Sequence, residues 1–129
     1  MYDCAFATCR SLKNVSIGNC AIITNYCFAQ CEELREVTLR QKGTYGELTL
    51  YPGAFGSCYR LSKITLDLSF VCSLATYSQL YDTPFKSTPI EGYTVYSQVG
   101  GIYVRPSLLS AYKNDSYWGK FSSIIKQIT

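Results

Sequence analysis

The chain has 129 residues, 47% hydrophobic and 16% charged, a composition that favours one domain with a packed core over a disordered chain. Its net charge of +3 comes from 12 basic and 9 acidic residues spread along the sequence, without the concentrated basic stripe that nucleic-acid binding requires. The chain contains no His, which excludes Ser-His and Cys-His nucleophile pairs and His-containing zinc motifs.

The sequence contains neither a candidate membrane-spanning segment nor a recognisable export signal. No run approaches the roughly 18 apolar residues that a membrane-spanning helix needs. No basic and then apolar leader precedes Tyr2. We therefore expect no membrane insertion and no export signal within this chain.

One skeleton of apolar residues occurs three times with identical internal spacing: Phe, two residues, Cys, two residues, Leu, two residues, Val or Ile, one residue, Ile or Leu. The anchors are Phe6, Cys9, Leu12, Val15 and Ile17, then Phe28, Cys31, Leu34, Val37 and Leu39, then Phe55, Cys58, Leu61, Ile64 and Leu66. One such unit has too little apolar surface to offset its own ordering entropy. We therefore expect stacked coils that bury equivalent residues in columns.

Each copy of the skeleton predicts two kinds of local structure. Residues 12–17, 34–39 and 61–66 alternate aliphatic and polar side chains at their C-terminal ends, which indicates half-buried strands that stack into one parallel sheet. The segment from each Phe to its Leu has a period of three, which predicts one or two turns of short helix on the opposite side. Shorter apolar segments at 21–24 and 47–50 predict a second, narrow set of strands.

The connections between copies differ in character. Residues 41–46 contain two Gly and predict an exposed turn, whereas residues 67–82 are apolar enough to fold back and pack. An aliphatic residue stands five positions before each later Phe, and Leu80 keeps this place before Phe85. After Phe85 the skeleton degrades, because Thr88 stands in the Cys slot.

The last part of the chain predicts a strand and then two helices. A strand returns at 102–104, and Pro106 fits the first turn of a helix. The spacing of Trp118, Phe121 and the isoleucines that follow predicts a second amphipathic helix to the end of the chain. We divide the chain, as one domain over 1–129, into about three full coils over 1–84, a degraded last coil over 85–105 and a helical C-terminal cap over 106–129.

These residues resemble the BspA-like leucine-rich repeat family of bacterial surface proteins. The similarity is carried by Ala5-Phe6 through Ile17 and by Ala54-Phe55 through Leu66. The closing passage, from Ile102 through Leu109, Tyr112-Lys113 and Trp118 to Ile125, is similar to that family's C-terminal cap. The resemblance implies an α/β repeat: a right-handed solenoid with a parallel concave sheet, short helical turns on the other side and a small helical C-terminal cap. It also implies adhesion or protein binding at a bacterial cell surface or in secreted form, without catalysis or a cofactor.

The repeated Cys slot holds Cys9, Cys31 and Cys58, three of seven cysteines. We interpret them as a column of buried thiols that act as small hydrophobic side chains. One disulfide between coils and a Cys-only zinc site are the alternatives. The spacings from Cys4 to Cys9 and from Cys27 to Cys31 are wider than the usual CxxC pair, so we expect no metal. Cys20 and Cys72 lie outside the skeleton and are expected to be more exposed.

The outward polar positions of the strands would form rows across the coils. The candidate binding residues are Lys13, Arg35 and Ser62 in one row, Asn14, Glu36 and Lys63 in a second, and Ser16, Thr38 and Thr65 in a third. The candidate aromatic contacts, chosen because Tyr is enriched at recognition surfaces, are Tyr45, Tyr51, Tyr93 and Tyr96. The alternative is a solvated face that only keeps the sheet soluble.

We predict a non-enzymatic module that binds a protein of a host or neighbouring cell. The alternatives are a structural cap of a longer repeat array whose ligand site lies upstream, and carbohydrate binding, which the 12 Tyr suggest. Because the first repeat is already under way at Phe6, we expect upstream repeats in a longer parent protein. An exposed first coil also predicts a homodimer through that coil.

Overall fold

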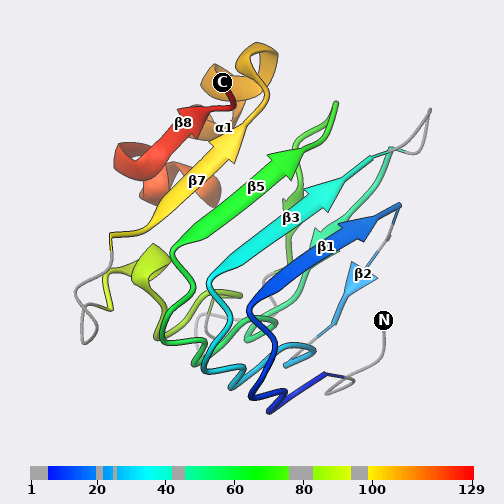
Figure 1. The fold of residues 1–129 in the computed structure, drawn as a ribbon. Helices are drawn as coiled ribbons and strands as arrows, with labels where there is room; N and C mark the ends of the chain where they lie inside the picture. Colours follow the sequence, from blue (N-terminus) through cyan, green and yellow to red (C-terminus); the bar gives the residue numbers. More distant parts are fainter. Residues whose placement is uncertain (1–5, 20–21, 25, 42–45, 76–82, 94–98) are drawn as a thin grey trace.

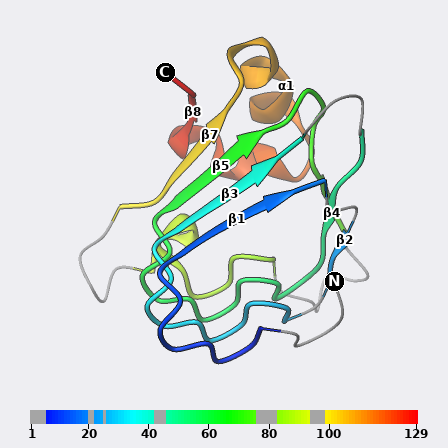
Figure 2. The same cartoon turned by 45° about the vertical axis from the view of Figure 1, so that its right-hand side comes forward.

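The structure is a computed structural model that describes residues 6–19, 22–24, 26–41, 46–75, 83–93 and 99–129. The chain winds through successive coils that stack beside one another, so that strands distant in sequence become neighbours (Figures 1 and 2). The main sheet is parallel and has the order β1 (Asn14–Gly18), β3 (Glu36–Arg40), β5 (Lys63–Asp67), β7 (Gly101–Val104) and β8 (Ile125–Gln127). A narrow parallel sheet contains β2 (Ile22–Ile23), β4 (Thr49–Leu50) and β6 (Ser73–Leu74).

The pairing of the main sheet follows the repeated skeleton. Val15 lies beside Val37, which lies beside Ile64, which in turn lies beside Ile102. A slip of one residue would turn every aliphatic side chain to the solvent face, so the burial pattern fixes this register. The predicted parallel sheet and the narrow second set of strands are both confirmed, and the fold is an α/β repeat.

The segments from each Phe to its Leu are consecutive turns, and the prediction of short helices there is wrong. In the third coil, Cys58 N–H donates to the carbonyl of Phe55 at 3.3 Å and Leu61 N–H donates to that of Cys58 at 3.0 Å. The residue two after each Phe has a φ of 58–60°, which a right-handed helix cannot include. These left-handed residues are Thr8, Gln30, Ser57 and Ser87.

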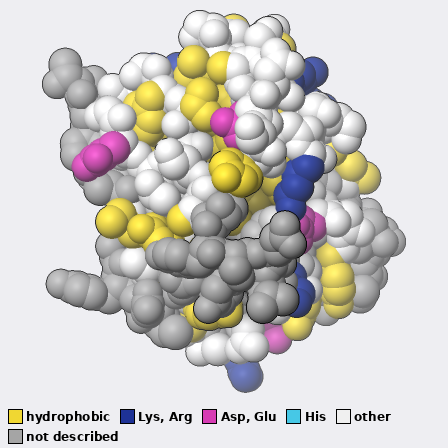
Figure 3. Space-filling model, turned by 180° about the vertical axis from the view of Figure 1, so that it is seen from behind, with side chains coloured by type: hydrophobic (Ala, Val, Ile, Leu, Met, Phe, Trp, Pro, Cys, Tyr) yellow, Lys and Arg dark blue, Asp and Glu magenta, His cyan; other side chains and the backbone are white. Residues whose placement is uncertain are grey.

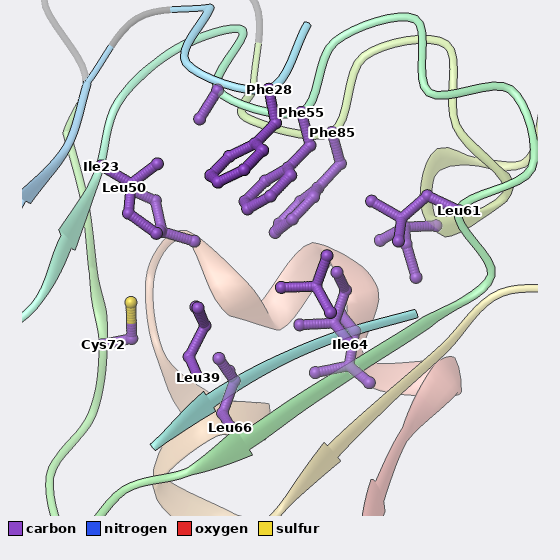
Figure 4. Packing of buried hydrophobic residues seen from close by; sticks show 14 of the residues in the cluster. Ile23, Phe28, Leu39, Leu50, Phe55, Leu61, Ile64, Leu66, Cys72 and Phe85 are labelled. Carbon is purple, nitrogen blue, oxygen red and sulfur yellow. The ribbon is translucent and has the colours of Figure 1, made fainter. Parts of the chain in front are cut away.

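The core is a column of Phe rings enclosed by the turns and the two sheets. Successive rings lie 5.1, 5.3 and 6.0 Å apart between centroids from Phe6 through Phe28 and Phe55 to Phe85, and are nearly parallel. Figure 4 shows three of these rings facing Leu39, Leu66 and Ile64 of the main sheet, with Ile23 and Leu50 of the narrow sheet at one side. Phe85, buried like Phe55, continues the column into the last coil, where the Thr88 hydroxyl donates to the Phe85 carbonyl at 2.7 Å.

The described part of connection 67–82 packs against the core, which confirms that part of the prediction. Leu68 and Cys72 are each 1% exposed, and Ser73–Leu74 forms the third strand of the narrow sheet. The expectation that Cys72 is exposed is therefore wrong. Cys20, Leu80 and residues 42–45 of the predicted exposed turn lie outside the described residues.

The C-terminal segment differs from the predicted pair of helices. The expected helix after Pro106 is present as the 3-10 turn Pro106–Leu108 followed by α1 (Leu109–Asn114). The second helix is present only as the 3-10 helix Trp118–Ile124, and its predicted continuation to the end of the chain is wrong, because β8 follows and pairs with β7. An exposed strand edge has unpaired N–H and C=O groups, and β8 satisfies one side of β7.

Aromatic side chains of this segment contact the last Phe of the column. The rings of Trp118 and Phe121 lie 5.9 and 6.0 Å from that of Phe85, and the ring of Tyr112 lies 5.5 Å from that of Trp118. All four of these side chains are buried. A further 3-10 helix, Pro89–Glu91, follows Thr88 and contacts the Trp118–Ile124 helix.

Candidate functional site

The structure brings the nine predicted binding residues together on and beside the outward face of the main sheet. Asn14, Glu36 and Lys63 are paired across neighbouring strands, as are Ser16, Thr38 and Thr65. The remaining row, Lys13, Arg35 and Ser62, comes just before the strands. Backbone hydrogen bonds link it, from Arg35 N–H to the carbonyl of Lys13 at 2.8 Å and from Ser62 N–H to that of Arg35 at 3.1 Å.

Five further residues extend these rows and were missed by the sequence reasoning. Arg40 and Asp67 continue the alternation of β3 and β5 by one outward position, where they pair with each other. Tyr103 is the partner of Thr65, and Lys126 is the partner of Tyr103. Arg105, the residue after β7, contacts Asp67. We call the full set the strand surface: Lys13, Asn14, Ser16, Arg35, Glu36, Thr38, Arg40, Ser62, Lys63, Thr65, Asp67, Tyr103, Arg105 and Lys126.

Two cations of the strand surface are held in place by uncharged groups. The guanidinium of Arg40 donates to the hydroxyl oxygen of Ser16 from Nε at 3.2 Å and from Nη2 at 2.7 Å. The Nζ of Lys63 lies 5.1 Å from the ring centroid of Tyr103, within cation–π range. These contacts order both side chains, and no carboxylate of the described residues forms an ion pair with either cation.

Gly101 creates the space that the ring of Tyr103 occupies. Gly101 is the register partner of Lys63 on β5. A Cβ atom at Gly101 would lie 3.1 Å from Cε2 of Tyr103 and 3.4 Å from its hydroxyl. The ring therefore lies over the backbone of its own strand, which brings it toward Lys63.

A third cation, Arg105, is paired with a carboxylate. Its Nε lies 2.7 Å from Oδ1 of Asp67, and its Nη2 donates to the Asp67 backbone carbonyl at 3.2 Å. The two side chains are 34% and 44% exposed, so water screens the pair and its contribution to stability is about 0–1 kcal/mol. Its main effect is to fix the position of both groups.

At the margin of the strand surface, Glu33 bridges two arginines. Its carboxylate lies 3.0 Å from Nη1 of Arg60 and 3.7 Å from Nη2 of Arg35. Arg60 belongs to the turn segment of the next coil, so the bridge links neighbouring coils. The carboxylate of Glu33 therefore partly balances the charge of Arg35.

The two predicted aromatic contacts that the structure describes, Tyr51 and Tyr93, lie outside the strand surface. Tyr51 follows β4 of the narrow sheet, and Tyr93 follows the Pro89–Glu91 helix, where its ring stacks on Tyr59 at 5.2 Å. Both are half-buried. Tyr45 and Tyr96 lie outside the described residues. The aromatic side chain within the strand surface is Tyr103.

The thiols of the repeated Cys slot form a column along the turn segments of successive coils. The thiol of Cys31 donates to the carbonyl of Phe6 at 3.2 Å, and that of Cys58 donates to the carbonyl of Phe28 at 3.1 Å. The contact between the two thiols lowers the pKa of Cys31 and, together with burial, raises the pKa of Cys58.

The described cysteines offer no metal centre. Cys9, Cys31, Cys58 and Cys72 carry free thiols, and the described residues contain no group of three or more side chains placed to ligate a metal ion. Cys4 lies outside these residues, as does Cys20. The column therefore fits the interpretation of buried thiols used as small hydrophobic groups.

A hollow of about 270 Å³ lies beside the C-terminal segment. Its lining is mainly apolar and includes Ile90, Val99 and Phe121, with an ion pair of 3.5 Å between Glu91 and Lys120 nearby. A small-molecule site usually has several convergent polar groups at fixed positions. The described lining offers few such groups, so the strand surface remains the candidate site.

The opposite side of the molecule has no comparable row of charges among its described residues. In the view from behind, the described Lys and Arg side chains are scattered, and Asp and Glu side chains lie among them (Figure 3). Within the described part of the chain, we find no helix whose length and apolar character would let it cross a bilayer.

Comparison with known proteins identifies the repeat. The family model described as "BspA type Leucine rich repeat region (6 copies)" matches residues 1–77. Comparison with curated proteins and with solved structures gave no match.

Proposed function

The chain belongs to the BspA-type leucine-rich repeat family, and from that premise we propose that it recognises a protein partner through the strand surface. Repeat proteins of this family are commonly protein-binding modules and generally not enzymes. The observation that carries the proposal is the ordered set of polar side chains on the main sheet. They project from paired strands, and a binding site on such rigid elements loses little entropy when a partner docks.

The proposal extends to the partner and the location. A protein of a host or neighbouring cell, bound in adhesion, fits a bacterial cell-surface or secreted protein, where this family typically occurs. The strand surface has both charge signs, several hydroxyls and one aromatic ring, which is the mixed composition of a non-obligate protein interface. A carbohydrate partner would favour several exposed aromatic rings, whereas the strand surface contains one aromatic side chain, that of Tyr103.

The proposal also includes the shape of the array. A right-handed sense fits the general rule for crossovers between parallel strands of one sheet. Curvature would make the strand surface concave, so that a convex partner could contact several coils at once. Residues 106–129 would act as a C-terminal cap, supported by the contacts of Trp118 and Phe121 with Phe85.

A binding screen tests the proposal. The wild-type protein would be applied to an array of extracellular-matrix proteins, epithelial surface proteins and glycans. The test variant carries Arg35→Ala, Glu36→Ala and Lys63→Ala. The matched control carries Arg10→Ala, Glu32→Ala and Lys113→Ala, exposed residues of the same three types outside the strand surface.

We expect protein spots that the control variant binds and the test variant does not. Hits bound equally by a correctly folded test variant would remove the strand surface from the proposal. Hits confined to glycans would favour carbohydrate binding instead.

A second candidate function, the structural cap of a longer array, is favoured by the aromatic cover over Phe85. In that role the ligand site lies on upstream repeats. A longer protein that binds a partner while residues 1–129 alone do not bind it would support this role. Binding by residues 1–129 with equal affinity would reject it.

We further propose self-association through the first coil. Phe6 at one end of the ring column is 42% exposed, and Ile22 of the narrow sheet is 40% exposed. Val15 and Ile17 on β1 are only partly buried, and β1 is an edge strand. A second copy that covers this edge would form a homodimer. Light scattering that gives the monomer mass at high concentration would reject it.

A further inference from the structure

We propose that the partner of the strand surface presents several carboxylates separated by neutral residues, as an acidic protein segment can. This inference rests on the proposed function and adds the chemistry of the partner. It is drawn from the placement of charges and from the contacts that order them.

The net positive charge of the chain is concentrated on the strand surface. This surface contains six of the 12 basic residues and two of the nine acidic residues, an excess of four positive charges against three for the whole chain. The remainder of the chain therefore has six basic and seven acidic residues. The basic residues of the strand surface are Lys13, Arg35, Arg40, Lys63, Arg105 and Lys126, and the acidic residues are Glu36 and Asp67.

The cations at the centre of this surface are ordered by uncharged groups. Arg40 is bound to the Ser16 hydroxyl, and Lys63 lies against the ring of Tyr103. Among the described residues, no carboxylate lies within ion-pair distance of Arg40, Lys63 or Lys126. A carboxylate of a partner could therefore pair with cations whose side-chain entropy is already partly lost.

The acidic residues of the surface distinguish among anionic partners. Asp67 is already paired with Arg105, whereas Glu36 lies in the row between Asn14 and Lys63. A uniformly anionic polymer, such as a sulfated polysaccharide, would place charge against Glu36 as well. A protein segment can alternate carboxylates with neutral hydrogen-bonding residues, and such a pattern avoids this repulsion.

Neighbouring strands give the cations a spacing that one acidic segment can span. Strands lie about 4.8 Å apart, so Lys63 on β5 and Lys126 on β8, two strands along the sheet, belong to backbones about 10 Å apart. The Debye length at physiological salt is about 8 Å, which is shorter than this spacing, so the electrostatic fields of the two cations overlap only in part. Binding should therefore weaken as salt rises, with contributions from several separate contacts.

Fluorescence anisotropy with a labelled peptide of alternating Glu and Ser tests the inference, with a Gln-Ser peptide as the neutral reference. The test variant carries Arg40→Gln and Lys63→Gln. The control variant carries Arg10→Gln and Lys113→Gln, so both variants lose the same net charge. All four residues are exposed, and circular dichroism checks that each variant is folded.

We expect the Glu-Ser peptide to bind wild type with a salt-dependent affinity that falls by about tenfold in the test variant and by less than about twofold in the control. Equal losses in both variants would show an effect of net charge alone and overturn the inference. Absence of peptide binding to folded wild type would also overturn it, as would heparin binding that depends on Arg40 and Lys63 without peptide binding.

The array described above separates this inference from the proposed function. Protein hits can be lost in the Arg35, Glu36 and Lys63 variant and yet not be displaced by the Glu-Ser peptide. Such hits would support recognition by the strand surface and would show that the partner is not acidic. If the peptide binds but no protein on the array does, the proposed recognition function is rejected. The preference of the strand surface for carboxylates would still be supported.

Discussion

The indole Nε1–H of Trp118 donates a hydrogen bond of 2.6 Å to the backbone carbonyl of Cys72, and both residues are buried. The Cys72 amide donates in turn to the hydroxyl of Tyr112 at 2.9 Å, and that hydroxyl donates to the carbonyl of Phe70 at 3.2 Å. Two side chains of the C-terminal segment thus satisfy the buried backbone of the connection after the third coil. This arrangement fastens the connection to the end of the stack.

The first prediction concerns the Tyr112 hydroxyl. Tyr112→Phe leaves the Cys72 amide and the Phe70 carbonyl without this partner, and we expect the free energy of unfolding to fall by about 1–3 kcal/mol. Tyr26→Phe removes a hydroxyl from an exposed Tyr and should cost less than about 0.5 kcal/mol. Urea unfolding measures both values, and equal losses would contradict the role of the Tyr112 hydroxyl.

The second prediction compares two positions of the Phe column. Phe55 is fully buried between two rings, whereas Phe6 has a ring on one side and is 42% exposed. Phe55→Ala should lower the free energy of unfolding by about 3–5 kcal/mol, because it opens a cavity in the middle of the column. Phe6→Ala should cost roughly half of that or less. A larger loss for Phe6→Ala would mean that the ring stack does not dominate the core.

The third prediction concerns the left-handed residue of the third coil. Ser57 has a φ of 58°, a conformation that β-branched side chains rarely adopt. Ser57→Val should therefore cost about 1–2 kcal/mol of stability, whereas Ser57→Gly should be nearly neutral. Ser73→Val is the control, because Ser73 is an exposed strand residue, where Val is favourable. Thermal unfolding that gave the two Val variants the same stability would contradict the left-handed turn.

The fourth prediction concerns alkaline pH. Burial raises the pKa of the Cys72 thiol above its ordinary value, so above about pH 8.5 the unfolded chain loses this proton before the folded protein does. The unfolded state then binds fewer protons, and the free energy of unfolding falls by about 1.4 kcal/mol per pH unit from this group. The stability is fully present below the unfolded pKa and is lost as pH rises toward the folded pKa.

Cys72→Ala isolates this contribution. We expect the variant to lose stability less steeply than wild type above about pH 8.5, while the difference between the two proteins stays constant at lower pH. Denaturant unfolding at a series of pH values gives both slopes. Parallel curves across the alkaline range would show that the Cys72 thiol ionises equally easily in the folded protein.

The sequence was most informative where the skeleton repeats. The spacing from Leu34 to Leu39 has equivalents in the other coils, and this was enough to predict the parallel pairing of Glu36 with Lys63. Three-residue spacing from Phe to Leu fits a helical turn and a chain of tight turns equally well. The left-handed residues that decide between them include Gln30 and Ser57, which have no strong left-handed preference.

The C-terminal error had a different cause. Trp118, Phe121 and Ile125 fit a helical period, and local spacing contains no information about the open edge of β7 that β8 pairs with. Lys126 was missed as a strand-surface residue for that reason. Arg40 could have been found by extending the alternation of its strand by one residue, whereas its contact with Ser16 depends on the neighbouring coil.

The most direct test of recognition by the strand surface is calorimetric titration of one protein from the array against three forms of this chain. These are wild type, the Arg35, Glu36 and Lys63 variant, and the matched Arg10, Glu32 and Lys113 variant. We predict that the strand-surface variant binds at least about tenfold more weakly than wild type, while the matched variant is unchanged. Full affinity in a folded strand-surface variant, or an equal loss in both variants, would contradict the account.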